Sequence, residues 1–228
     1  THYSVKENVE LALRSWSAFK NFDDYLQDEE ASSGLVQCGY LISAPEGNKQ
    51  SSLRESLLAQ KRQGITLEYL SPQQAHELLP IACFDDAALI GYEPNAGFAD
   101  AYLVTTGFAR AARKLGVSFK EGCLVQGLIL DGRRVVGVRT SLGDEIAACV
   151  VSTQNIWSGQ LKDWTGFDVP LKPERHTVLA LEGPRAYSQK MPVFKDLGSP
   201  GMLYCRSYGG NQMLVSEGIS GEVLHSPD

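Results

Sequence analysis

Residues 102–152 read YLVTTGFARAARKLGVSFKEGCLVQGLILDGRRVVGVRTSLGDEIAACVVS, and this stretch decides the fold class. Its first part, 102–115, has the apolar spacing of a helix and ends at Gly116, a common residue just past a helix end. Apolar runs typical of strands follow at 117–121, 123–130, 135–140 and 145–152. Asp131-Gly132 and a second turn at 142–144 separate the last three runs. The stretch therefore predicts one helix followed by a small antiparallel meander.

The sequence on both sides of this stretch predicts further helices and strands. Apolar residues with a 3.6-residue period predict helices over 5–26, 51–63 and 73–79, and a short helix over 157–164. Ser4 and Glu7 have the spacing of a capping box for the first helix. Strands are predicted at 35–42, 65–70 and 177–182, a Pro/Gly-rich connection at 183–200, and a hairpin of 202–208 with 212–217. Because strands and helices neither alternate strictly nor form separate runs, the predicted fold class is α+β or mixed α/β.

Composition and charge exclude several classes of protein. The chain has 228 residues, 43% hydrophobic and 21% charged, which suits one large domain or two small ones. The net charge is −6 and the basic residues are scattered, so no nucleic-acid partner is expected. No apolar run approaches the roughly 20 residues of a membrane span. The chain begins at Thr1 rather than Met and has no leader pattern, so we expect a cytoplasmic protein whose natural start lies elsewhere.

The cysteines and histidines give no pattern of a disulfide framework or a metal site. The five cysteines are widely spaced and odd in number, without a C-x-x-C motif, and are interpreted as free thiols in a reducing cytoplasm. Cys38 and Cys149 lie in apolar runs, where cysteine behaves as a small hydrophobic residue. The four histidines share no spacing, so no metal site is predicted.

Short catalytic motifs are also missing. The chain contains no G-x-G-x-x-G dinucleotide turn, no P-loop and no G-x-S-x-G nucleophile elbow. The acidic pairs Asp23-Asp24 and Asp85-Asp86 are interpreted as a helix end and a solvated turn rather than as a catalytic carboxylate dyad. Motifs alone therefore do not identify an enzyme.

A broader pattern extends over 91–176. It consists of GYEP at 91–94, GFAD at 97–100, CLVQG at 123–127, VVSTQNIWS at 150–158 and PERH at 173–176. In order and spacing it resembles the middle of the FAD-dependent amine oxidoreductases, which include D-amino-acid, glycine, sarcosine and dimethylglycine oxidases and their dehydrogenase relatives. The flanks are similar too, with His2-Tyr3 before a long helix and Tyr204-Cys205-Arg206 in a late strand.

The resemblance implies a division into domains. Residues 1–92 would form the first part of a substrate-domain lobe, 93–165 a returning segment of the FAD-binding domain, and 166–228 the second part of the substrate lobe. The substrate domain would have a mainly antiparallel sheet with flanking helices. In the family, the glycine-rich unit precedes the position of Thr1. The 228 residues would therefore be a central fragment that holds no FAD and is inactive by itself.

The resemblance also places cofactor residues. Val125 would hold the adenine through its backbone, although a core strand valine is an equal alternative. Ser152, Thr153, Asn155 and Trp157 match the run near the flavin ribose and phosphate, and a buried core aromatic is the favoured interpretation of Trp157. Asn155 stands where glycine is usual, and asparagine tolerates the left-handed backbone that glycine provides.

Substrate residues are expected on the late strand. Tyr204 and Arg206 lie two positions apart, so their side chains share a face, and a phenol with a guanidinium suits an amino-acid carboxylate. A surface ion pair between Arg206 and Glu217 is the alternative. Asp100 is expected to cap the helix that follows it, and Arg175-His176 to link the domains.

The implied function is flavin-dependent oxidation of the C–N bond of a small amino acid or secondary amine, with FAD as cofactor and an electron acceptor or partner subunit left open. Two alternatives remain. A relative of the same fold could oxidise a 2-hydroxy acid or glycerol phosphate. A flavin-less binding or scaffold module would also be consistent with Gln154 and Asn155, which stand where the family usually has alanine and glycine.

Overall fold

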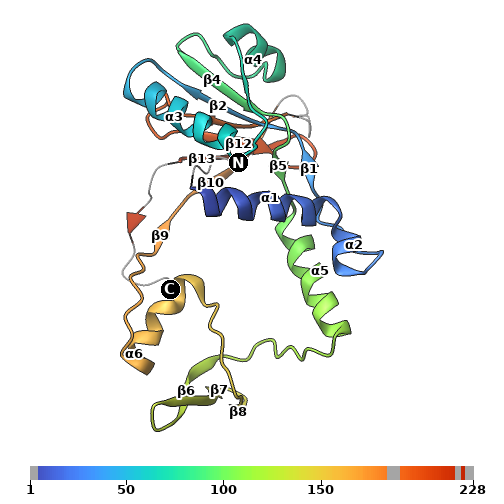
Figure 1. Cartoon of the computed structure of the whole chain (residues 1–228), viewed down its shortest axis with the longest axis vertical. Coiled ribbons are helices and arrows are strands. Elements are labelled where there is room, and N and C mark those ends of the chain that lie inside the picture. Colours follow the sequence, from blue (N-terminus) through green and yellow to red (C-terminus); the bar gives the residue numbers. More distant parts are fainter. Residues whose placement is uncertain (1–4, 184–190, 219–221, 224–228) are drawn as a thin grey trace. The chain divides into compact units, whose positions relative to one another are not determined.

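A computed structural model describes residues 5–183, 191–218 and 222–223 and divides the chain into two compact units (Figure 1). The large unit comprises Thr1–Gly116 and His176–Ile219, and the small unit comprises Val117–Arg175 and Ser220–Asp228. One boundary falls between Arg175 and His176, the dipeptide expected to link the domains. The assignment of 1–92, 93–165 and 166–228 to substrate and flavin domains stays a prediction.

The large unit is built on a mixed sheet, which confirms the predicted fold class. Its seven strands run in the order β10-β13-β12-β11-β2-β4-β3. Their bounds are β2 Tyr40–Ala44, β3 Glu68–Tyr69, β4 Leu89–Glu93, β10 Val178–Glu182, β11 Val193–Asp196, β12 Tyr204–Ser207 and β13 Gln212–Ser216. The pairing of β11 with β2 is parallel, and the other neighbours are antiparallel. The predicted hairpin of β12 and β13 is confirmed, but β11 lies in a stretch predicted to be only a connection.

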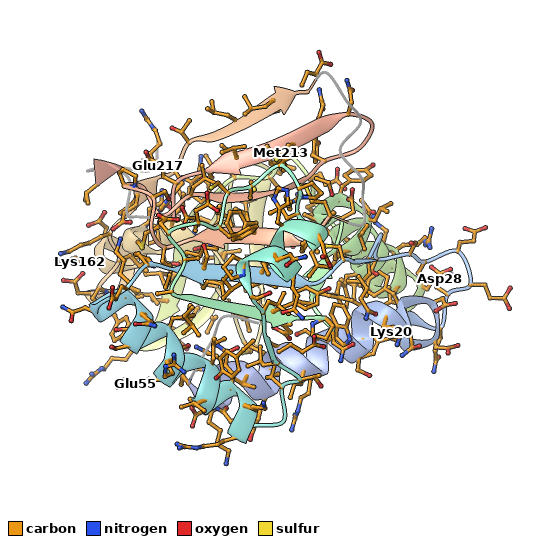
Figure 2. All side chains as sticks on the ribbon, turned by 90° about the horizontal axis from the view of Figure 1, so that it is seen from above. Lys20, Asp28, Glu55, Lys162, Met213 and Glu217 are labelled. Atoms are coloured by element: carbon orange, nitrogen blue, oxygen red, sulfur yellow. The ribbon has the colours of Figure 1, made fainter. Side chains whose placement is uncertain are left out.

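Helices cover the two faces of this sheet with separate apolar cores. On the first face, called the α3 face, helix α3 (Asn48–Arg62) packs along β2 and β4 (Figure 1). Its core contains Val9, Ile42, Ala44, Leu53, Leu57, Ile65, Leu67 and Leu89. The opposite side, called the α4 face, carries α4 (Pro72–Leu78) and a core of Leu41, Ala75, Leu79, Phe84, Ile90, Met191, Phe194 and Cys205. Glu55 lies on the outer side of α3, away from the sheet (Figure 2).

Side-chain caps begin two of the helices, α4 and α5 (Ala101–Lys114). The helix predicted over 5–26 is split at Asn21 into α1 (Lys6–Lys20) and α2 (Phe22–Leu26), and its expected cap Ser4 lies outside the described residues. A complete capping box of Ser71 and Gln74 begins α4. The predicted cap of α5 is confirmed, because the Leu103 N–H donates to Asp100 Oδ1 at 2.9 Å.

Two further strands form a short ribbon beside the sheet. Strand β1 (Val36–Gln37) pairs antiparallel with β5 (Gly97–Phe98). The strand predicted over 35–42 is therefore interrupted between β1 and β2, where Gly39 adopts a φ of +84°. This ribbon brings the Phe98 ring next to Arg206 of β12.

An ion cluster ties the segment after α2 to α5. The Asp28 carboxylate is 3% exposed and accepts from Arg110 Nε at 2.5 Å and Lys114 Nζ at 3.0 Å. The pKa of Asp28 is lowered, chiefly by the hydrogen bond from Lys114 and also by Arg110, against the opposing effect of burial. Phe22 packs edge-on against Phe108 of α5 in the same region, with ring centroids 5.4 Å apart.

We expect Asp28→Asn to destabilise the protein at neutral pH. A carboxyl group whose pKa is lowered in the folded state stabilises that state above its unfolded pKa, and the contribution disappears as the pH falls through the folded value. The difference in stability between native and variant protein should therefore narrow as the pH falls below the ordinary carboxyl pKa of 3.8. Urea denaturation at successive pH values measures it. Glu30→Gln, an 85% exposed neighbour of Arg110, is the control and should have little effect.

The small unit contains the predicted meander but has no core of its own. Strands β6 (Val125–Asp131), β7 (Arg134–Thr140) and β8 (Gly143–Ile146) pair antiparallel in that order, and η1 (Asn155–Gln160) and α6 (Leu161–Thr165) follow. Strand β9 (Glu174–Arg175) pairs with β14 (Glu222–Val223). Of residues 117–175, only Gly127 and Gly137 are buried.

Two predictions for this unit are wrong. Residues 117–121 form no strand, because no neighbouring strand pairs with them. Strand β8 ends at Ile146, so Cys149 is exposed rather than a buried hydrophobic residue, whereas Cys38 is buried as predicted.

Candidate functional site

Tyr204 and Arg206 lie on the same face of the central sheet, as their spacing predicts. The alternate residues of β12, Cys205 and Ser207, are buried on the opposite face, the α4 face. Tyr204 is paired with Lys195, which is in turn paired with Ile42 of the α3-face core. Opposite residues in neighbouring strands share a face, so Tyr204 and Arg206 belong to the α3 face.

Aromatic rings fix the Arg206 guanidinium group. Its central carbon lies 4.3 Å from the ring centroid of Phe98 and 5.7 Å from that of Tyr208, and Nη1 donates to the Ser207 carbonyl at 3.0 Å. Cation–π contacts of this kind hold a guanidinium plane while leaving its edge free for a second partner. The alternative ion pair with Glu217 is wrong, because Arg206 is opposite Leu214 and the two side chains form no ion pair.

An open hollow of about 760 Å³ lies at Arg206. This hollow is called the Arg206 hollow. It is lined by Phe98, Tyr208 and Glu182, by the first turn of α5 from Asp100 to Leu103, and by the turn 209–211. Gly209 and Gly210 both have positive φ, +51° and +54°, which lets the turn between β12 and β13 close tightly. A hollow of this size accommodates a small amino acid with room for a second group.

Burial keeps the hydroxyl and thiol groups near Arg206 protonated. It raises the pKa of Tyr204, an effect that the charge of Arg206 partly opposes, and it raises the pKa of Tyr40 strongly. Burial also raises the pKa of the Cys205 thiol to about 11 and raises that of Cys38. Tyr204 is therefore a neutral hydrogen-bond donor at physiological pH, and the buried thiols are poor nucleophiles.

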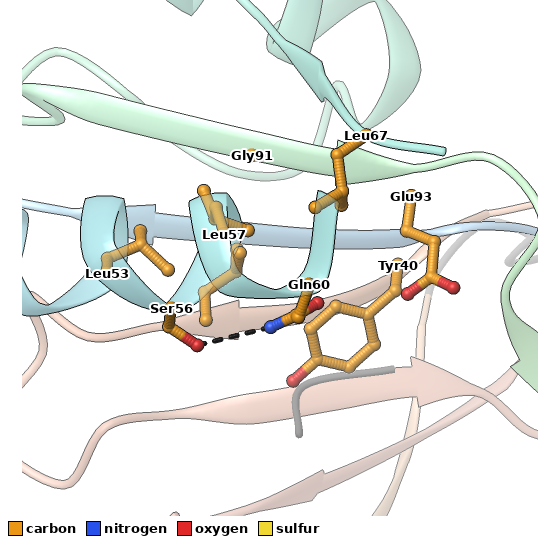
Figure 3. A pocket seen from close by; sticks show the side chains of 9 residues that line it. Tyr40, Leu53, Ser56, Leu57, Gln60, Leu67, Gly91 and Glu93 are labelled. Carbon is orange, nitrogen blue, oxygen red and sulfur yellow. Dashed lines mark hydrogen bonds between the residues drawn. The ribbon is translucent and has the colours of Figure 1, made fainter. Parts of the chain in front are cut away.

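A second, much smaller cavity lies under α3. It has a volume of about 30 Å³ and is lined by Tyr40, Gln60 and Glu93, among others (Figure 3). The Gln60 amide nitrogen donates to Ser56 Oγ at 3.2 Å. The space holds little more than one water molecule, so it is too small for an organic substrate.

The predicted cofactor residues lie in the small unit. Val125 is the first residue of β6 and pairs with Thr140, and it is partly buried, which leaves both of its interpretations open. Ser152 and Thr153 are exposed and lead into η1. The predicted cofactor residues and the pair Tyr204 and Arg206 thus lie in different units.

Asn155 and Trp157 form the turn that begins η1. Asn155 adopts a φ of +51°, the left-handed conformation that its position opposite a family glycine suggested. The Trp157 N–H donates to the Gln154 carbonyl at 3.1 Å. Trp157 is 42% exposed, so its interpretation as a buried core aromatic is wrong for the described chain.

Phe98, Tyr208 and Glu182 line the Arg206 hollow but were not among the residues predicted from the sequence. Tyr208 continues the alternation of Tyr204 and Arg206 along the chain, and that period could have identified it. Phe98 reaches Arg206 through the pairing of β5 with β1, and Glu182 reaches the hollow through the pairing of β10 with β13. Neither pairing has a local sequence signal.

The part of the chain that the structure describes contains no group of three or more His, Cys, Asp or Glu side chains that could hold a metal ion. None of its helices combines the length and the apolar character that crossing a bilayer requires.

Comparison with known proteins gives a consistent set of relatives. A family model described as FAD dependent oxidoreductase matches residues 1–225. The sarcosine oxidase subunit beta of Arthrobacter sp. is 34% identical over 140 residues, which cover 59% of this chain and 34% of that protein. A D-amino acid dehydrogenase of Xylella fastidiosa (strain M12) is 33% identical over 132 residues, or 57% of this chain and 30% of that protein.

Solved structures share the fold at low sequence identity. L-proline dehydrogenase from P. horikoshii superposes with a TM-score of 0.85 at 19% identity, over 99% of this chain and 59% of that one. Glycine oxidase from Geobacillus kaustophilus gives a TM-score of 0.77 at 20% identity, over 93% and 56%. The chain thus spans about a third of the curated relatives and just over half of these solved chains.

Proposed function

Because the chain belongs to the FAD-dependent oxidoreductase family, we propose that the full-length protein oxidises the C–N bond of a small amino acid or secondary amine such as sarcosine or glycine. The observation that carries this proposal is Arg206, a guanidinium group in contact with two aromatic rings at an open hollow large enough for an amino acid. Relatives that act on sarcosine, glycine, D-amino acids and L-proline support the same substrate class.

Membership of the family implies FAD, and the residues of the small unit fit it. The left-handed Asn155 keeps the turn conformation that glycine gives in the family, and Ser152, Thr153 and Trp157 beside it are exposed. We assign these four residues to the ribose and phosphate, and the Val125 backbone to the adenine. When bound, FAD would supply the hydride acceptor for oxidation of the substrate C–N bond. Because no glycine-rich phosphate turn is in the sequence, residues 1–228 alone are expected not to retain FAD.

The residues of the large unit would bind and orient the substrate. Arg206 would bind the carboxylate through two parallel N–H bonds. Tyr204, a neutral phenol on the same sheet face, does not line the hollow and stays a predicted substrate residue. Phe98 and Tyr208 hold the guanidinium group and limit the access of water to it. These groups orient the substrate without themselves acting as acid or base.

Anaerobic flavin bleaching of the full-length protein tests the proposal. The flavin band should bleach with at least one of sarcosine, glycine and proline, and not with 2-hydroxyglutarate. Bleaching by 2-hydroxyglutarate alone would assign the protein to the hydroxy-acid relatives. A colourless full-length protein that FAD cannot reconstitute would instead identify a flavin-less module.

Variants of Asn155 test the assignment of the FAD turn. Asn155→Val should weaken FAD retention by the full-length protein about tenfold, because a β-branched residue is strained at positive φ by roughly 1–2 kcal/mol. Asn155→Gly should retain FAD as well as the native protein does. The matched control is Gln154→Val, since Gln154 has a φ of −69° that valine adopts readily. Fluorescence of released FAD measures the effect, and equal retention by Asn155→Val and native protein contradicts the assignment.

A further inference from the structure

Glu182 of β10 lies on the same sheet face as Arg206 of β12, two strands away across the Arg206 hollow. It is paired with Gln212, and the Tyr208 N–H donates to the Gln212 carbonyl at 2.9 Å, so Glu182, Gln212 and Tyr208 form one row across β10, β13 and β12. All three line the hollow together with Arg206. The shared row places the Glu182 side chain on the α3 face.

The strand geometry leaves room for a short ligand between the two charges. Neighbouring strands lie about 4.8 Å apart, which puts the Glu182 backbone about 10 Å sideways from Tyr208. Arg206 is set back by two residues along β12, or about 7 Å. Two side chains reaching toward each other over this separation leave a gap of a few ångströms, roughly the length of an α-amino acid.

The charges in the hollow are those of a receptor for a zwitterion. Arg206 is the cation among the lining side chains, and Asp100 and Glu182 are the anions. Asp100 is engaged at the start of α5, where it accepts the Leu103 N–H. Glu182 is exposed, and no hydrogen bond or ion pair of its side chain occurs within the described residues. It is therefore the carboxylate available to a ligand.

Building on the proposed function, we infer that Glu182 determines specificity for amines by binding the cationic nitrogen of the substrate while Arg206 binds its carboxylate. The substrate class is then an amino acid with a protonatable primary or secondary amine. A 2-hydroxy acid of the same size leaves Glu182 without a cation, so the hollow disfavours it.

Binding of two isosteric ligands tests the role of Glu182. Sarcosine and butanoate differ only by a cationic NH₂ group in place of a CH₂ group. Their affinities for the full-length protein are measured by calorimetry with the flavin reduced, so that no turnover occurs. Glu182→Gln should weaken sarcosine about threefold to fivefold, as expected for a solvent-accessible ion pair, and leave butanoate unchanged. Glu217→Gln, which removes the same charge from the end of β13, is the matched control and should change neither affinity (Figure 2 labels Glu217).

The outcomes separate the role of Glu182 from the proposed function. If Glu182→Gln weakens both ligands equally, or neither, the assignment of Glu182 is overturned. Provided that Arg206→Ala still loses both ligands, the proposed function stands in that case. If the native protein binds neither ligand, the proposed substrate class fails and the role of Glu182 fails with it.

Discussion

Arg206→Ala is expected to raise the KM of the full-length protein for its amino-acid substrate about 100-fold. Removing the guanidinium group leaves the substrate carboxylate without its charged partner in a partly desolvated hollow, a loss of roughly 2–5 kcal/mol in comparable pairs, and partial exposure puts Arg206 near the lower end. Arg206→Lys keeps the charge but loses the planar fork and the stacking on Phe98, so about a tenfold rise is expected.

Steady-state kinetics of the full-length protein measure this effect. Arg54→Ala is the control, because Arg54 is an exposed residue of α3 and its loss should leave KM unchanged. An unchanged KM in Arg206→Ala would remove the central observation on which the proposed function depends.

Leu41→Ala is expected to have the largest effect on stability, about 3 kcal/mol of unfolding free energy. Leu41 is fully buried in the central strand β2 and contributes to the α4-face core, where truncation leaves a cavity that rigid strands cannot close. Hydrogen exchange of the β2 and β4 amides measures this loss of unfolding free energy, because these amides report on the large unit and not on the small one. Leu58→Ala on α3, where the side chain is 40% exposed, is the control and should cost well under the Leu41 value.

Local signals account for the elements that the sequence predicts correctly. The helix over 73–79, the Asp100 cap and the hairpin turn at 209–211 each depend on a few adjacent residues, so periodicity and turn chemistry are enough to find them. The meander of β6, β7 and β8 is found for the same reason. Resemblance to a family, rather than any motif, led to FAD and to Tyr204 and Arg206.

Distant partners account for the misses. Strand β11 is only four residues long and is a strand because it lies between β2 and β12. Residues 117–121 have an apolar pattern typical of a strand but no strand to pair with. Phe98 and Glu182 enter the hollow only through long-range pairings. Side-chain pattern predicts what a segment can form, and tertiary pairing decides whether it does so.

The parallel pairing of β2 with β11 has a consequence for the order of folding. It joins the two halves of the large sheet through positions 153 residues apart, as the Ser43–Asp196 hydrogen bond of 3.0 Å shows. During synthesis, β2, β4 and α3 emerge and can associate early, whereas β11 and the strand that bears Arg206 arrive only after residues 117–175 of the small unit have been made. Closing so long a loop is slow, so β11 and the strand that bears Tyr204 and Arg206 join the sheet after β2, β4 and α3 have associated.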